Sequence, residues 1–193
     1  MKLALVLAIL GSGAAAESCP KIADLETGVL LTQTSPMLSM VYVQTADGLT
    51  EARAPSADAS PATVDTIYSH PLTPVARLVN GNILGIDYAE DVSALDNLAE
   101  TQRWETAVTL THNGDVFTMG TYTAVFLRTD WVPLSECAYD VWILRDLLML
   151  DNGAAIHTEK RYAPSLGLVL GSIELDAQNQ PTGSIIFNEI AAE

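Results

Sequence analysis

The sequence predicts a mainly β protein, an antiparallel meander that forms a curved sheet, half-barrel or barrel with one or two short helices. Asn-Gly pairs at 80–81, 113–114 and 152–153 each lie between apolar runs rich in β-forming residues. Asn-Gly suits the two-residue type I′ hairpin, because both central residues need a positive φ. The regular spacing of turn residues toward the C-terminus is typical of β-sandwiches and barrels. We expect a single domain over residues 17–193, with roughly eight to ten strands.

Residues 1–16 have the pattern of a secretory signal peptide. Lys2 supplies the positive start, residues 3–10 form an apolar run, and Ala14-Ala15-Ala16 offers a small-residue cleavage site. The run is too short to span a bilayer, which takes about 20 residues in a helix. A lipoprotein acylated at Cys19 is the rival interpretation, and Glu17 fits that kind of signal poorly.

The two cysteines of the chain predict one disulfide, Cys19–Cys137, as is usual in an exported protein. A bridge that closes so long a loop is worth roughly 4–5 kcal/mol in the chain-entropy model. We therefore expect a periplasmic or secreted protein.

The charge of the chain excludes some classes of partner. Nine Lys and Arg face 24 Asp and Glu, for a formal net charge of −15. Nucleic acids and anionic membrane surfaces need cationic partners, so neither is expected. With three Trp and three Phe the chain is also poor in the aromatic girdles of a membrane barrel. We expect no integral membrane protein, and partners limited to a hydrophobic small molecule or a basic protein.

The N-terminal half holds the less regular elements. Residues 22–31 suit either a helix or a strand, and Asp47-Gly48 marks a fourth, weaker hairpin. Residues 51–63 are rich in Ala, Pro and Ser and predict a mobile loop. Residues 89–100 predict a short helix with Asp91 as a candidate N-cap.

The turn at 113–114 predicts the register of the two strands that it joins. If Asn113-Gly114 forms the whole loop, Leu110 faces Phe117 and Val108 faces Met119, which gathers large apolar side chains on one face.

The hairpin at 152–153 is less consistent. The same register would pair Asp146 with Glu159 and Arg145 with Lys160, which are unfavourable like-charge pairs. A bulge near 144–147 would relieve them, and a diagonal contact of Asp146 with Arg161 would offset part of the cost.

The segment from 137 onward completes the meander. Residues 137–150 are apolar on both faces and predict a long central strand, with a helix as the alternative. A turn at 164–167 and strands at 167–175 and 184–190 follow.

Catalytic chemistry finds little support in the sequence. His70, His112 and His157 lack metal-ligand spacing, and the nucleophile-elbow, Walker and dinucleotide motifs are missing. An acidic cluster at residues 87–96 is better explained as a solvated face than as a calcium site. We expect no catalytic residue, no cofactor and no metal.

The inward-facing aromatic and methionine side chains suggest a function. A curved sheet can hold an apolar ligand in its mouth. The candidates for lining such a cavity are Trp104, Val108, Leu110, Phe117, Met119 and Trp142. Ordinary core packing is the simpler interpretation of these residues.

The leading hypothesis is thus an exported, non-catalytic binding module that holds a hydrophobic or lipid-like ligand. One alternative is a structural or interaction protein whose acidic surface meets a basic partner. The other is a hydrolase whose site is assembled across strands, with a histidine beside a serine or carboxylate.

Overall fold

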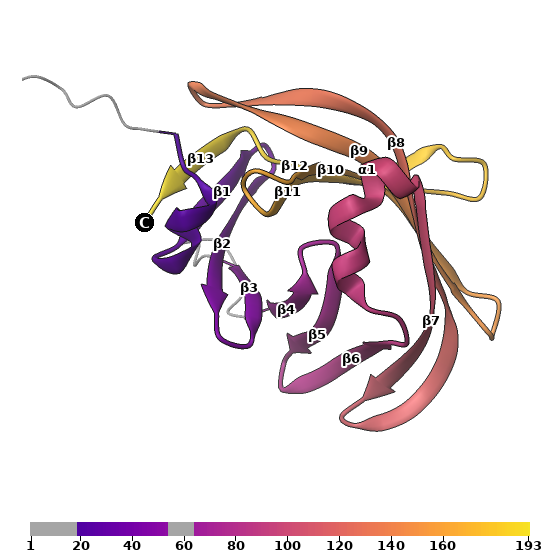
Figure 1. The fold of residues 1–193 in the computed structure, drawn as a ribbon. Helices are drawn as coiled ribbons and strands as arrows, with labels where there is room; N and C mark the ends of the chain where they lie inside the picture. The colour runs from indigo at the N-terminus through magenta and orange to yellow at the C-terminus, as the bar shows by residue number, and fades with distance from the viewer. Residues whose placement is uncertain (1–18, 54–63) are drawn as a thin grey trace, which may run out of the picture.

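The computed structural model describes residues 19–53 and 64–193. The expected signal peptide at 1–16 and most of the expected loop at 51–63 lie outside the described residues, while 51–53 end a strand. One antiparallel sheet curves around a central space, with its neighbours in chain order as a meander (Figure 1). The predicted fold class is confirmed. The described ranges hold thirteen strands, more than the eight to ten expected.

The strands are numbered along the chain. The first six are β1 (Val29–Thr34), β2 (Met37–Thr45), β3 (Gly48–Arg53), β4 (Val64–His70), β5 (Thr73–Val79) and β6 (Asn82–Tyr88). The others are β7 (Arg103–His112), β8 (Asp115–Leu134), β9 (Cys137–Leu150), β10 (Ala155–Ala163), β11 (Leu168–Leu175), β12 (Pro181–Ile186) and β13 (Glu189–Ala192). The strand alternative for residues 137–150 is therefore the correct one, and the expected last strand is split in two.

Three short helical segments accompany the sheet: η1 (Ile22–Glu26), η2 (Val92–Asn97) and α1 (Leu98–Thr101). The ambiguous stretch 22–31 divides into η1 and the start of β1. The expected helix at 89–100 consists of η2 and α1, and it lies inside the curve of the sheet (Figure 1). Asp91 caps it as expected, accepting a hydrogen bond from the Ser93 N–H at 2.9 Å.

The C-terminal segment brings the two ends of the sheet together. Strand β12 pairs with β11 and β13 pairs with β1, and only two residues separate them. The Asn188 N–H donates to the Thr32 carbonyl at 2.9 Å, and the Ile186 N–H donates to Gln33 Oε1 at 2.8 Å. These bonds hold the ends side by side, although no ladder joins β12 to β13.

Two of the three Asn-Gly hairpins have the predicted turn. Asn80 and Gly81 have φ of 51° and 81°, and Asn113 and Gly114 have φ of 51° and 90°, as type I′ requires. At the third pair only Gly153 has a positive φ, 85°. There the Leu150 N–H donates to the Ala154 carbonyl at 2.8 Å, so the loop is longer than two residues.

The register predicted for the β7–β8 hairpin is correct for its first two pairs and wrong beyond them. His112 faces Asp115 and Thr111 faces Val116, but Leu110 then faces Thr118. Phe117 is the extra residue of a β-bulge, which shifts every later pair by one position. The residues of β8 beyond the bulge therefore face the opposite way from the prediction. Tyr122 and Ala124 point inward, and Met119 does not.

The longer turn at Gly153 removes the like-charge problem of the third hairpin. Arg145 faces the opposite charge of Glu159, and Arg145 Nε lies 3.1 Å from Glu159 Oε2. Asp146 faces Thr158. The bulge expected at 144–147 does not occur between β9 and β10, because these two strands pair without a register shift.

Two apolar clusters form the core of the described residues. The Leu25 cluster includes Leu25 of η1, and its fully buried members are Val29, Leu31, Leu134, Val141, Ala163, Leu166, Leu168 and Leu170. The Leu95 cluster surrounds η2 and α1, and it includes Leu72, Leu98, Trp104, Val108, Tyr122, Leu144, Leu148 and Tyr162. Each helical segment thus contributes one buried leucine to a cluster, namely Leu25 from η1, Leu95 from η2 and Leu98 from α1.

The predicted disulfide Cys19–Cys137 is present, with 5.6 Å between the Cα atoms. Nearby, the Tyr139 hydroxyl donates to the Pro20 carbonyl at 2.9 Å. Together they fix the N-terminal end of the described chain to β9. The bridge is compatible with an oxidising compartment outside the cytosol.

Candidate functional site

A cavity of about 480 Å³ lies inside the curve of the sheet. Every strand from β2 to β12 contributes to its lining, which is mostly apolar. It takes side chains from both apolar clusters, such as Leu49 from one and Leu148 from the other. The volume is within the usual range of pockets that hold a small molecule.

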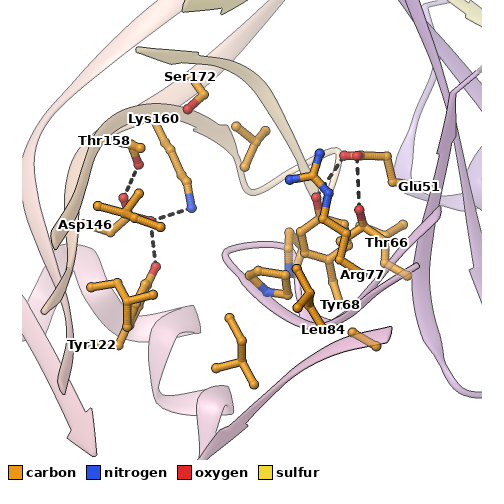
Figure 2. Close-up of a pocket in the computed structure, with 18 of the residues that line it drawn as sticks. Glu51, Thr66, Tyr68, Arg77, Leu84, Tyr122, Asp146, Thr158, Lys160 and Ser172 are labelled. Carbon is orange, nitrogen blue, oxygen red and sulfur yellow. Dashed lines mark hydrogen bonds and ion pairs between the residues drawn. The ribbon is translucent and has the colours of Figure 1, made fainter. Parts of the chain in front are cut away.

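One wall of the cavity carries a buried carboxylate, Asp146 of β9, which is only 5% exposed. The Tyr122 hydroxyl lies 2.8 Å from Asp146 Oδ2 and 3.1 Å from the Leu72 carbonyl oxygen. The Thr158 hydroxyl donates to Oδ1, and Lys160 Nζ forms an ion pair with Oδ2 (Figure 2). Three donors therefore surround this carboxylate.

The strand register explains this cluster. Thr158 is the direct partner of Asp146 across the β9–β10 ladder. Lys160 follows two residues later, on the same face of β10. Burial, followed by the negative charge of Asp146 and the hydrogen bond to it, raises the pKa of Tyr122 well above its usual value. Tyr122 therefore stays a neutral donor.

The facing wall carries a second carboxylate, Glu51 of β3 (Figure 2). The hydroxyls of Tyr42 and Tyr68 both donate to its Oε2 at 2.8 Å, and the Thr66 hydroxyl lies 3.5 Å from Oε1. Tyr42 and Thr66 are the cross-strand partners of Glu51 in β2 and β4. The site is thus assembled by three adjacent strands.

Burial is the main cause that raises the pKa of both tyrosines well above the usual value, and the Glu51 charge adds to it. The positive charge of Arg77, which also lines the cavity, partly offsets the effect on the pKa of Tyr68. Both tyrosines are therefore neutral donors to the Glu51 side chain.

Apolar side chains surround the mouth of the cavity. Leu84, Phe117 and Ile156 line the cavity and are still 41%, 55% and 57% exposed. They belong to β6, β8 and β10. Each lies close to a hairpin turn, and in a meander these three turns lie at the same end of the strands.

The six residues named from the sequence as cavity-lining candidates are placed in three ways. Leu110 and Phe117 are among the lining residues. Trp104 and Val108 are buried in the Leu95 cluster, and Trp142 packs there against Phe126 and Tyr162. Met119 is 54% exposed, because the bulge at Phe117 turns it to the outer face of β8.

Sequence reasoning missed the polar groups of the cavity. It treated Asp146 and Lys160 as a pairing conflict between strands, and it placed Glu51 at the edge of a loop. The available signal was the alternation of Leu144, Asp146 and Leu148, which sets a carboxylate on an inward apolar face. Nothing comparable marked Glu51.

The histidines lie away from the cavity, since none of them is among its lining residues. His70 is buried, accepts the Leu72 N–H at Nδ1 (3.2 Å), and has Nε2 3.4 Å from Asp96 Oδ1. Burial lowers its pKa, and Asp96 partly offsets this. Over residues 19–53 and 64–193, no His, Cys, Asp and Glu side chains gather into a group that could hold a metal ion.

Within the part of the chain that the structure describes, no helix has the length and hydropathy needed to cross a bilayer. The chain matches none of the family models, curated proteins or solved structures with which it was compared.

Proposed function

We propose that this protein is an exported, non-catalytic binding module whose cavity holds a hydrophobic or lipid-like small molecule. The observation that carries the proposal is the cavity of about 480 Å³ inside the sheet, with apolar walls and a few buried polar groups. Such a combination is the common form of a small-molecule site, in which apolar walls supply affinity and polar groups supply orientation.

The state of the two carboxylates supports binding over catalysis. Asp146 is engaged by Tyr122, Thr158 and Lys160, and Glu51 is engaged by two tyrosines. A general base needs a free lone pair within reach of a substrate proton. Three donors engage Asp146 and two engage Glu51 Oε2, so only some of the roughly four acceptor sites of each carboxylate remain for a substrate proton, and the described histidines are not among the lining residues.

The disulfide supports the export that the proposal includes, because such bonds persist in the periplasm and outside the cell. The acidic-surface hypothesis remains a second candidate, favoured by the net charge of −15. It predicts capture of a basic partner that salt disrupts.

The proposal can be tested with the purified protein, stripped of lipid and titrated with a neutral fluorescent dye. We expect saturable binding that decanol displaces. Phe117→Asp should weaken it, because it puts a charge at the apolar mouth. Trp131→Asp is the matched control, at the far end of the same strand and 63% exposed. A protein that binds neither dye nor decanol would refute the proposal.

A further inference from the structure

The charged groups that line the cavity balance one another. Among the described residues they are two carboxylates, Glu51 and Asp146, and two cations, Arg77 and Lys160. The whole chain, in contrast, has a formal net charge of −15. The cavity is therefore a neutral compartment within an acidic protein, and a charged ligand would upset its balance.

The acceptors at Asp146 are already engaged. Its two oxygens take Tyr122, Thr158 and Lys160, and Asp146 is only 5% exposed. An ammonium group entering the cavity would find this carboxylate paired with Lys160 and would face the Lys160 charge. A cation at this wall would therefore lose its hydration without gaining a free carboxylate partner.

Donors, in contrast, remain available on the same wall. The Lys160 ammonium has three N–H groups. One points to Asp146. A second has only a weak acceptor, the Leu72 carbonyl oxygen, which lies 3.5 Å from Nζ. The Ser172 hydroxyl lies beside Lys160, because the two residues are direct partners across the β10–β11 ladder (Figure 2). Both residues line the cavity, and Lys160 keeps N–H capacity for a further acceptor.

An anionic head group would supply an acceptor but at a high cost. It would place a second negative charge beside Asp146, with only the shared Lys160 to offset both. Like charges that share a buried site are strongly unfavourable. A neutral oxygen atom, as in an alcohol, ester or ketone, accepts the same hydrogen bonds without that repulsion.

We propose that the ligand is an uncharged, oxygen-bearing amphiphile whose oxygen accepts hydrogen bonds from Lys160 and Ser172 while its apolar part fills the cavity. The inference rests on the proposed function and deepens it, by excluding fatty-acid anions and long-chain amines as the preferred ligands. The cavity selects against charge of either sign because its four lining charges sum to zero and Asp146 already pairs with Lys160.

The test compares three probes with one chain and different heads: decanol, decanoate and decylamine, each displacing the neutral dye at neutral pH. Wild-type protein should bind decanol about tenfold or more tightly than either charged probe. Asp146→Asn leaves Lys160 without its counter-ion, so the preference should move to decanoate by a similar factor. Lys160→Met should weaken decanol several-fold.

Asp140→Asn is the matched control, because it makes the same change in net charge on an exposed position of the same strand. It should keep the wild-type ranking. Equal binding of the three probes, or equal behaviour of Asp146→Asn and Asp140→Asn, would overturn the inference while leaving the proposed function standing. Binding of none of the probes would refute the proposed function itself. If Asp146→Asn does not fold, the wild-type ranking and the Ser172→Ala variant, expected to weaken decanol alone, still decide.

Discussion

Tyr122 connects the core of the protein to its cavity. Its ring packs in the Leu95 cluster, in edge contact with Trp104 and Tyr88, while its hydroxyl reaches Asp146. A buried carboxylate is tolerated only when its hydrogen bonds are made. The residue therefore has a structural role and a role in preparing the site.

Tyr122→Phe should destabilise the protein by about 1–3 kcal/mol, because it leaves a buried charged acceptor short of one donor. Tyr88→Phe is the matched control, since its hydroxyl donates only to the neutral Pro74 carbonyl, at 3.1 Å. It should cost about 0.5–1.5 kcal/mol. Urea unfolding of the two variants measures the difference, and equal losses would contradict the importance given to the Asp146 cluster.

His70 should make the stability depend on pH in a definite direction. Burial lowers its pKa below the ordinary 6.5, so the unfolded chain takes up a proton that the folded protein does not. Stability should fall as the pH drops from about 7 to about 5. In His70→Asn the amide oxygen can still accept the Leu72 N–H, and this part of the pH dependence should be missing. Unfolding midpoints that change equally with pH in both proteins would contradict the assignment.

Among the elements, β8 decides most of the shape. It is the longest strand, Asp115–Leu134, and its pairing shifts at Phe117 against β7 and again between Phe126 and Arg128 against β9. Bulges bend a strand and increase its twist. The sheet curves around the cavity in part because of these two irregularities.

The close approach of β8 to β9 depends on Gly120. A Cβ there would lie 2.2 Å from the Met149 carbonyl oxygen, so Gly120→Ala requires a backbone shift. We expect a loss of about 1–3 kcal/mol, as for overpacked sites. In Gly183→Ala the nearest atom is the mobile Glu174 Oε2, at 3.2 Å, and the change should stay within about 0.5 kcal/mol. Thermal melting of both variants tests this, and two equal shifts would argue against the close packing.

The elements also show how far sequence reasoning reaches. Asn-Gly turns at 80–81 and 113–114 were predictable, because their positive φ values have a local chemical cause. The bulge at Phe117 was not, since no residue type beside the turn marks it, although it reverses the face of every later residue of β8. For the same reason Met119 was assigned to the inner face. The polar walls of the cavity escaped prediction because Glu51 and Asp146 are far apart in the chain.

At the scale of the whole molecule, the described chain is held at its N-terminal end, and its C-terminal segment brings the two ends of the open sheet side by side. The disulfide ties Cys19 to β9 across a sequence separation of 118 residues. Replacing both cysteines by serine should cost about 2–5 kcal/mol, the usual loss when a small domain is deprived of a native disulfide. Urea unfolding measures it, and mass spectrometry under non-reducing conditions checks the bridge. Free thiols in the native protein would contradict the pairing.

The central claim is that the interior of the sheet is a binding site and not an incidental gap in the packing. Leu148→Trp tests it most directly, because Leu148 lines the cavity on the same inward face of β9 as Asp146 and a larger ring there would take up part of its space. In a dye titration the wild type should show saturable binding of one molecule per chain, displaced by decanol, and a folded Leu148→Trp protein should bind the dye at least about tenfold more weakly. Undiminished binding by that variant, or no binding by the wild type, would contradict the account.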